Sequence, residues 1–182
     1  VGGCADVLEQ VGVTKAPPDL AEWEEIGFVR YLQRKRLFLS ARNVETTERV
    51  PSFAKEEEAE TILALMQQSF EPYTSALPDL DTLRQDIREN RVLAAREGEK
   101  LLGFLRFGRE KKVSVLWQIA VAPDGRGKGI GSGLVQDWLV IERDEAAKFQ
   151  LWVREDNPSA LRMYEASGFL PDGRIAPVMM KK

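Results

Sequence analysis

The stretch VAPDGRGKGIGSGL, residues 121–134, constrains the fold most, because it places five glycines and two cations between two patterned segments. The apolar run VSVLWQIAVA before it indicates a strand, and Leu134, Val135, Trp138 and Leu139 after it recur at helical spacing. A glycine loop between a strand and a helix exposes the unpaired amides and the positive dipole end of the helix. Glycine also lets a ligand approach the backbone closely. The stretch therefore predicts an anion site, with phosphate as the expected ligand.

Two familiar phosphate loops do not fit this stretch. It lacks the G-x-x-x-x-G-K-[ST] spacing, and no Ser or Thr follows a lysine to hold magnesium. Residues 127–131 read G-x-G-x-G instead of G-x-G-x-x-G, although Gly129, Gly131 and Ser132 lie close to that spacing. No clear ribose-binding acid follows the strand KFQLWV. A glycine-rich turn without a ligand stays open as the alternative.

Composition limits the classes of partner and location. The 182 residues suffice for one domain with an extension, and the net charge of −3 gives no basic field that would attract nucleic acid. No apolar run reaches the length of a bilayer span, and the start of the chain lacks a signal-peptide pattern. Cys4 is the single cysteine, so no intrachain disulfide can form. We expect a cytoplasmic protein without nucleic-acid or membrane partners.

The chain contains no histidine, which narrows the chemistry further. Ser-His-Asp and Cys-His catalysis and the usual zinc ligand sets are excluded, and no metal is expected. Any general acid or base must be Asp, Glu, Tyr, Lys, Cys or water.

From about residue 49 onward, helical and strand patterns alternate. Helical spacing predicts helices over 55–70, 80–90, 131–147 and 157–168. Strand patterns cover 48–54 (weakly), 91–97, 100–110, 113–122 and 148–155. Two further short strands are predicted around a turn in 168–182. The short turns at 97–100 and 108–112 favour antiparallel hairpins. A strand, a helix and another strand in succession require a crossover, so part of the sheet is expected to be parallel. These patterns predict an α/β fold with a mixed sheet flanked by helices.

Two motifs carry a resemblance to a known family. Arg126-x-x-Gly129-x-Gly131 matches the [Q/R]-x-x-G-x-[G/A] acyl-CoA loop of the GNAT N-acetyltransferase superfamily. Downstream, NPSALRMYEASGF at 157–169 is similar to that family's N-x-x-A-x-x-x-Y-x-x-x-G-F segment. The preceding QIAVAP resembles the family's fourth strand. The motifs stand in the family's order and separation, and the resemblance covers about residues 49–182.

The resemblance implies an enzyme that transfers acetyl from acetyl-CoA to a primary amine by direct attack, without a metal. It also implies a mixed, mostly antiparallel GNAT-like sheet with a splayed parallel pair. The implied pantetheine-binding backbone is at Ile119, Ala120 and Val121, and the implied pyrophosphate-binding amides are at Arg126, Gly127, Lys128, Gly129, Ile130, Gly131 and Ser132. Asn157 is implied to bind the pantetheine arm, and Tyr164 to bind the cosubstrate and protonate the leaving thiolate.

For Asn157 and Tyr164 a structural role stays open beside the implied one. Asn157 precedes Pro158 and suits a helix N-cap, a role compatible with ligand binding. Tyr164 suits a core position, packed beside Leu161 and Phe169.

The general base and the acceptor are not readable from the sequence. The family often uses a glutamate on its fourth strand, where this chain has Gln118 beside Trp117. Candidate carboxylates are Glu71, Asp79, Asp81 and Glu155, and a water molecule is the alternative. The first three would suit a cationic acceptor. We expect a small-molecule amine, with a protein or peptide amine, or a non-catalytic acyl-CoA-binding module, as alternatives.

Residues 1–45 form an extension to the expected domain at 46–182. Shifted by 141 positions, this extension aligns with the second motif, and its match ends with Gly27 on Gly168 and Phe28 on Phe169. In this alignment Ala16 stands at the position of Asn157 and Trp23 at the position of Tyr164, so the residues with implied chemical roles do not match. The pattern suggests the remnant of a preceding degenerate repeat. The alternative is a family-specific helix from Leu20 and a hairpin of 28–32 with 36–41, docked on the core sheet or on a second subunit as a homodimer.

Overall fold

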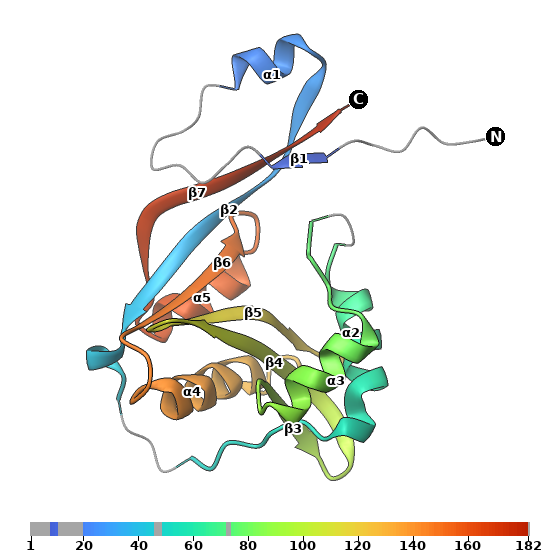
Figure 1. The fold of residues 1–182 in the computed structure, drawn as a ribbon, viewed down its shortest axis with the longest axis vertical. Coiled ribbons are helices and arrows are strands. Elements are labelled where there is room, and N and C mark those ends of the chain that lie inside the picture. Colours follow the sequence, from blue (N-terminus) through green and yellow to red (C-terminus); the bar gives the residue numbers. More distant parts are fainter. Residues whose placement is uncertain (1–7, 11–19, 46–48, 72–73, 182) are drawn as a thin grey trace, which may run out of the picture.

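A single seven-stranded sheet organises the computed structural model, which describes residues 8–10, 20–45, 49–71 and 74–181 (Figure 1). The strand order is β1-β7-β2-β6-β5-β4-β3. The strands are β1 Leu8–Gln10, β2 Phe28–Ser40, β3 Val92–Glu97, β4 Lys100–Glu110, β5 Val113–Val121, β6 Lys148–Arg154 and β7 Leu170–Lys181. Among these described strands only β5 and β6 pair in parallel, so the predicted mixed, mostly antiparallel sheet is confirmed. Cys4 lies outside the described residues.

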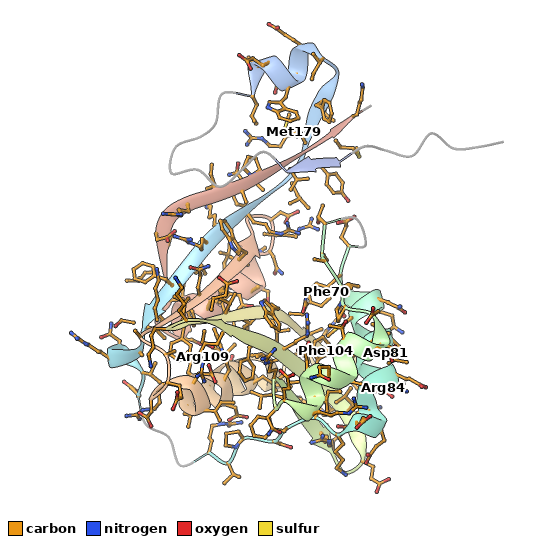
Figure 2. All side chains as sticks on the ribbon, in the orientation of Figure 1. Phe70, Asp81, Arg84, Phe104, Arg109 and Met179 are labelled. Carbon is orange, nitrogen blue, oxygen red and sulfur yellow. The ribbon has the colours of Figure 1, made fainter. Side chains whose placement is uncertain are left out.

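Helices cover both faces of the sheet. They are α1 Ala21–Glu25, α2 Ala59–Ser69, α3 Leu80–Arg88, α4 Ile130–Glu142 and α5 Pro158–Ala166. Alternate strand residues point to opposite faces, so Leu105 packs in the cluster with Trp138 of α4, while Phe104 packs in the cluster of α2 and α3 (Figure 2). The helices α2 to α5 lie within the segments predicted as helical, except that α4 begins one residue earlier, at Ile130.

Two predicted strand boundaries are wrong. Residues 49–54, the described part of the strand predicted over 48–54, form a single isolated bridge, Phe53 to Leu93, and Pro51 has no amide to donate to a longer ladder. The two short strands expected in 168–182 are one strand, β7. Their predicted turn is a bulge, since the register with β2 jumps from Ile175 to Pro171.

The N-terminal segment supplies an inner strand of the sheet. The hairpin expected from 28–32 and 36–41 is instead one continuous strand, β2, since the intervening QRK at 33–35 contains no turn-forming residue. β2 pairs with β6 along one edge and with β7 along the other. The segment therefore docks on the core sheet of its own chain. The homodimer stays a prediction.

The outer ends of β2 and β7 run side by side away from α2, α3, α4 and α5, and α1 lies at their tip (Figure 1). Leu20, Phe28 and Met179 form a small separate core there (Figure 2). This small core holds the outer end of β2 paired with the outer end of β7, away from the central core.

The two segments aligned in the sequence also share a local geometry. α1 ends before Gly27 at φ 92°, and α5 ends before Gly168 at φ 88°. In each, the glycine amide donates at 3.0 Å to the carbonyl three residues back. A phenylalanine and a strand follow in both cases. The origin of 1–45 as a degenerate repeat stays a prediction.

Candidate functional site

A bulge opens the sheet between β5 and β6. The parallel pairing of these strands ends at Leu116 and Leu151, although both strands continue. On the other edge of β5, the register with β4 shifts so that Trp117 is an extra residue between Leu116 and Gln118. A bulge bends its strand, so the remainder of β5 diverges from β6. Along this stretch, no described strand satisfies the β5 backbone on its β6 side.

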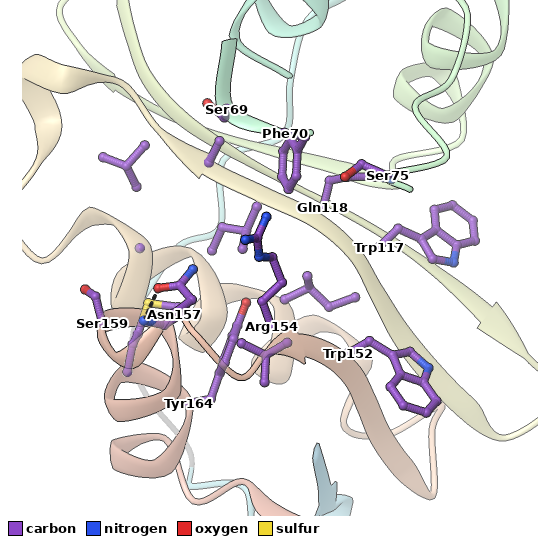
Figure 3. A pocket seen from close by; sticks show the side chains of 18 of the residues that line it. Ser69, Phe70, Ser75, Trp117, Gln118, Trp152, Arg154, Asn157, Ser159 and Tyr164 are labelled. Atoms are coloured by element: carbon purple, nitrogen blue, oxygen red, sulfur yellow. Dashed lines mark hydrogen bonds between the residues drawn. The ribbon is translucent and has the colours of Figure 1, made fainter. Parts of the chain in front are cut away.

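A cleft of about 1180 Å³ occupies the opening. It is bordered by β5, β6, the glycine loop, the start of α5, the segment after α2 and one residue of β2. Figure 3 shows Tyr164 and Arg154 pointing into it from the α5 and β6 side, with Phe70 and Gln118 opposite.

The glycine loop forms one end of the cleft. After a 3-10 turn at Pro123–Gly125, Gly129 is the N-cap of α4 with φ 73°, a left-handed conformation that favours glycine. All but one of the residues implied in cosubstrate binding line the cleft, namely Ile119, Ala120, Val121, Arg126, Gly127, Gly129, Ile130, Gly131, Ser132, Asn157 and Tyr164. The exception is Lys128, which is not among the lining residues and whose Nζ lies 3.4 Å from a carboxylate oxygen of Glu97.

Asn157 and Tyr164 lie on one face of α5, two turns apart. The Asn157 Oδ1 accepts a hydrogen bond from the Ala160 amide at 3.1 Å, which confirms the N-cap, and the residue also lines the cleft (Figure 3). Tyr164 is 4% exposed and packs its ring against Phe169, while its hydroxyl points into the cleft. Its ring thus belongs to the core and its hydroxyl to the site.

The comparisons with known proteins agree with this geometry. Residues 59–169 match the model of the Acetyltransferase (GNAT) family. The chain belongs to the GNAT family. It is accordingly an N-acetyltransferase, a member of a family that uses acetyl-CoA as cosubstrate.

Curated GNAT relatives include two whose names contain a small molecule. The S-(2-succino)cysteine N-acetyltransferase of Bacillus subtilis is 30% identical over 138 residues, which are 66% of this chain and 83% of that protein. The mycothiol acetyltransferase of Brachybacterium faecium is 30% identical over 139 residues, 69% of this chain but 42% of that protein. Among solved structures, a GCN5-related N-acetyltransferase from Sphaerobacter thermophilus has a TM-score of 0.75 at 16% identity, covering 97% of this chain and 59% of that one.

Within this GNAT cleft, burial sets the chemistry of Tyr164. Desolvation raises the pKa of its phenol well above the ordinary value, because the charged phenolate would lose its hydration. The hydroxyl therefore stays protonated throughout the physiological pH range. It can act as a proton donor but not as a base at neutral pH.

One of the four candidate carboxylates reaches the cleft. Glu71 is the only acidic side chain among the described lining residues, and its Oε2 accepts hydrogen bonds from the Thr74 amide and hydroxyl at 2.9 and 2.6 Å. Asp79 instead caps α3, and Glu155 lies 3.3 Å from the ammonium of Lys35. Asp81 projects from the outer side of α3 (Figure 2), with its side chain 97% exposed.

Gln118 is held by a buried ion pair. Its Oε1 accepts from Arg106 at 2.9 Å, and the Nε of Arg106 donates to Asp86 at 2.7 Å. The Arg106 guanidinium also stacks 4.5 Å from the Trp117 ring centre. This network fixes the side chains next to the bulge. Sequence reasoning missed the cleft-lining Arg106, and helical spacing offered no sign that Asp86 would be buried.

The other lining residues that were not predicted include Arg34, Trp152 and Arg154. Trp152 and Arg154 lie at the end of β6, a strand that was predicted. They line the cleft because the pairing of β6 with β5 ends at Leu151, which the sequence did not indicate. Arg34 lies in the N-terminal segment, and no sequence signal connected it with the cleft.

No helix of the described residues is long and apolar enough to cross a membrane. Among the same residues, no group of three or more Cys, Asp or Glu side chains could hold a metal ion. The cytoplasmic location stays a prediction.

Proposed function

We propose that this chain transfers the acetyl group of acetyl-CoA to the primary amine of a small molecule bound in the cleft. The observation that carries the proposal is the opened β5–β6 pair, with the glycine loop at one end and the Tyr164 hydroxyl facing the opening. The small molecules in the names of the curated relatives support a small-molecule acceptor.

The site suits extended binding of the cosubstrate. The uncovered backbone of Ile119 to Val121 would pair with the pantetheine amides as an added strand does. The first amides of α4 and the Arg126 guanidinium would hold the pyrophosphate. The amide near Ile119 would polarise the acetyl carbonyl.

The chemical step is then a direct displacement. The neutral amine nitrogen attacks the thioester carbonyl carbon, the C–N bond forms, and the C–S bond breaks. The Tyr164 hydroxyl donates a proton to the leaving thiolate, and the surplus proton of the amine leaves through Glu71, directly or by a water molecule. Solvent afterwards reprotonates Tyr164.

Replacing Glu71 with Gln is expected to lower kcat/KM by about 10- to 100-fold, because the amide cannot accept a proton. The loss should be smaller at high pH, where more of the acceptor amine is already neutral. Steady-state rates between pH 6.5 and 9.5 would measure it. Glu155→Gln serves as the control, since Glu155 is a surface carboxylate outside the cleft lining. Equal pH profiles for the wild type and Glu71→Gln would contradict the role of Glu71.

Replacing Gly129 with Glu is expected to weaken acetyl-CoA binding at least 100-fold. The substitution strains a left-handed position and puts a negative charge where the pyrophosphate would bind. Isothermal titration of acetyl-CoA into the protein measures the change.

Gly98→Glu is the matched control. Gly98 also has a positive φ of 62° and open space around its Cβ position, but it lies in the β3–β4 turn outside the cleft. Equal weakening by both substitutions would contradict the loop assignment. Tight binding with no thiol release in the presence of any amine would favour a non-catalytic acyl-CoA-binding module. Turnover of peptide amines alone would favour a protein acceptor.

A further inference from the structure

Two arginines stand directly opposite each other at the cleft. Arg34 of β2 is the register partner of Arg154 of β6, and both line the cleft. Opposite residues of antiparallel strands project to the same face at close range, where two like charges destabilise the sheet. A bound anion would convert this repulsion into attraction.

The charges of the cleft are unequally compensated. Its lining contains four arginines, and Glu71 is the one carboxylate among the described lining residues. Arg106 is neutralised by the buried Asp86. The Nε and Nη2 of Arg154 donate to Asp156 at 2.9 and 2.7 Å.

Arg34 differs from those two, because no carboxylate of the described residues lies within ion-pair distance of it. Its Nη2 donates to the carbonyl and hydroxyl oxygens of Thr74 at 3.0 and 2.8 Å. Thr74 in turn donates to Glu71, so neutral oxygens separate the guanidinium from the carboxylate. Desolvation, and then the neighbouring Arg154, lower the pKa of the half-buried Arg34. The charge of Glu71 acts in the opposite sense and raises this pKa, without an ion pair to Arg34. The guanidinium is thus oriented, partly dehydrated and only partly compensated by negative charge.

The position of the pair relates it to the acceptor. Figure 3 shows the side chains of Arg154 and Tyr164 both pointing into the opening, and Arg34 also lines it. Arg126 already provides a cation at the glycine loop, where the pyrophosphate would bind. An anion held by Arg34 and Arg154 would belong to the molecule whose amine is acetylated.

We propose that Arg34 and Arg154 bind a carboxylate of the acceptor, so that the substrate class is small amines that carry a carboxylate, such as amino acids and their derivatives. The N-terminal strand β2 thereby contributes a specificity-determining side chain to the site. This inference rests on the proposed acetyl transfer.

Matched pairs of amines test the inference. Thiol release from acetyl-CoA is measured with glutamate and glutamine, with S-carboxymethylcysteine and S-carbamoylmethylcysteine, and with amino acids and their α-amides. The wild type is expected to prefer the free acids by at least tenfold in kcat/KM. Arg34→Gln should reduce that preference about 10- to 100-fold, the range expected for hydrogen bonds to a charged group. Arg30→Gln is the control, because Arg30 is an exposed cation on the same strand and outside the cleft lining.

Two further measurements separate the possible failures. Calorimetric binding of succinate, compared with succinamide, to the CoA-bound chain gives the same comparison without turnover. The acetyl-CoA affinity of Arg34→Gln should equal that of the wild type, and a cooperative melting transition should show that the variant is folded. Loss of acetyl-CoA affinity in Arg34→Gln would assign the pair to the cosubstrate phosphates and overturn the inference.

The remaining outcomes are equally decisive. Equal use of acids and amides, an unchanged preference in Arg34→Gln, or binding of neither succinate nor any acidic amine would overturn the inference while acetyl transfer to other amines stands. Failure of the wild type to bind acetyl-CoA would overturn the proposed function itself, and the inference with it.

Discussion

Replacing Tyr164 with Phe is expected to lower kcat about 100-fold while leaving acetyl-CoA affinity and the melting temperature nearly unchanged. The ring packs against Phe169 in the core, and phenylalanine keeps that packing. The lost hydroxyl is the group that would protonate the departing thiolate. Because this proton is transferred only as the C–S bond breaks, the loss should appear in kcat and not in binding.

The pH dependence gives a second readout for Tyr164. Burial raises the pKa of the phenol, so the acid stays protonated as pH rises past the ordinary tyrosine value. The wild-type rate should therefore rise with pH as the acceptor amine loses its proton, with no decline below about pH 10 from ionisation of Tyr164.

Single-turnover rates and calorimetry of the wild type and Tyr164→Phe would measure these effects. Tyr31→Phe is the matched control, because Tyr31 is a half-exposed tyrosine of β2 outside the cleft lining. A kcat within twofold of the wild type would assign Tyr164 to packing alone.

Removing residues 1–45 is expected to abolish cooperative folding of the remaining chain. β2 lies between β6 and β7, so its removal leaves unpaired ladder groups on both neighbouring strands. It also removes the buried side chains Leu32, Leu37 and Leu39, each worth about 1.5–3 kcal/mol. That sum is comparable with the whole stability of a typical domain, about 5–15 kcal/mol.

Circular dichroism during thermal unfolding, with acetyl-CoA titration, would test this expectation on residues 46–182. A synthetic peptide of residues 20–45 is the control, since its addition should restore both the transition and the binding. A truncated chain that melts cooperatively near the wild-type temperature and binds acetyl-CoA equally well would show that 46–182 is independent.

The sequence predicted the local geometry around the cleft, because each part of it depends on neighbours in the chain. The glycine loop, the cap at Asn157 and the face shared by Asn157 and Tyr164 follow from spacing and residue type. The two motifs identified the family, which the family model confirms. Lys128 was included with the loop because of its position, but its side chain reaches Glu97 at the end of β3.

The N-terminal strand marks the limit of what the sequence determined. Its apolar residues predicted a strand, but hydrogen bonding to β6 and β7 was decided by chain segments more than 100 residues away. A strand pattern records which face is buried and not which edge is paired. Only the tertiary structure therefore placed Arg34 opposite Arg154 and brought a side chain of the N-terminal segment into the cleft.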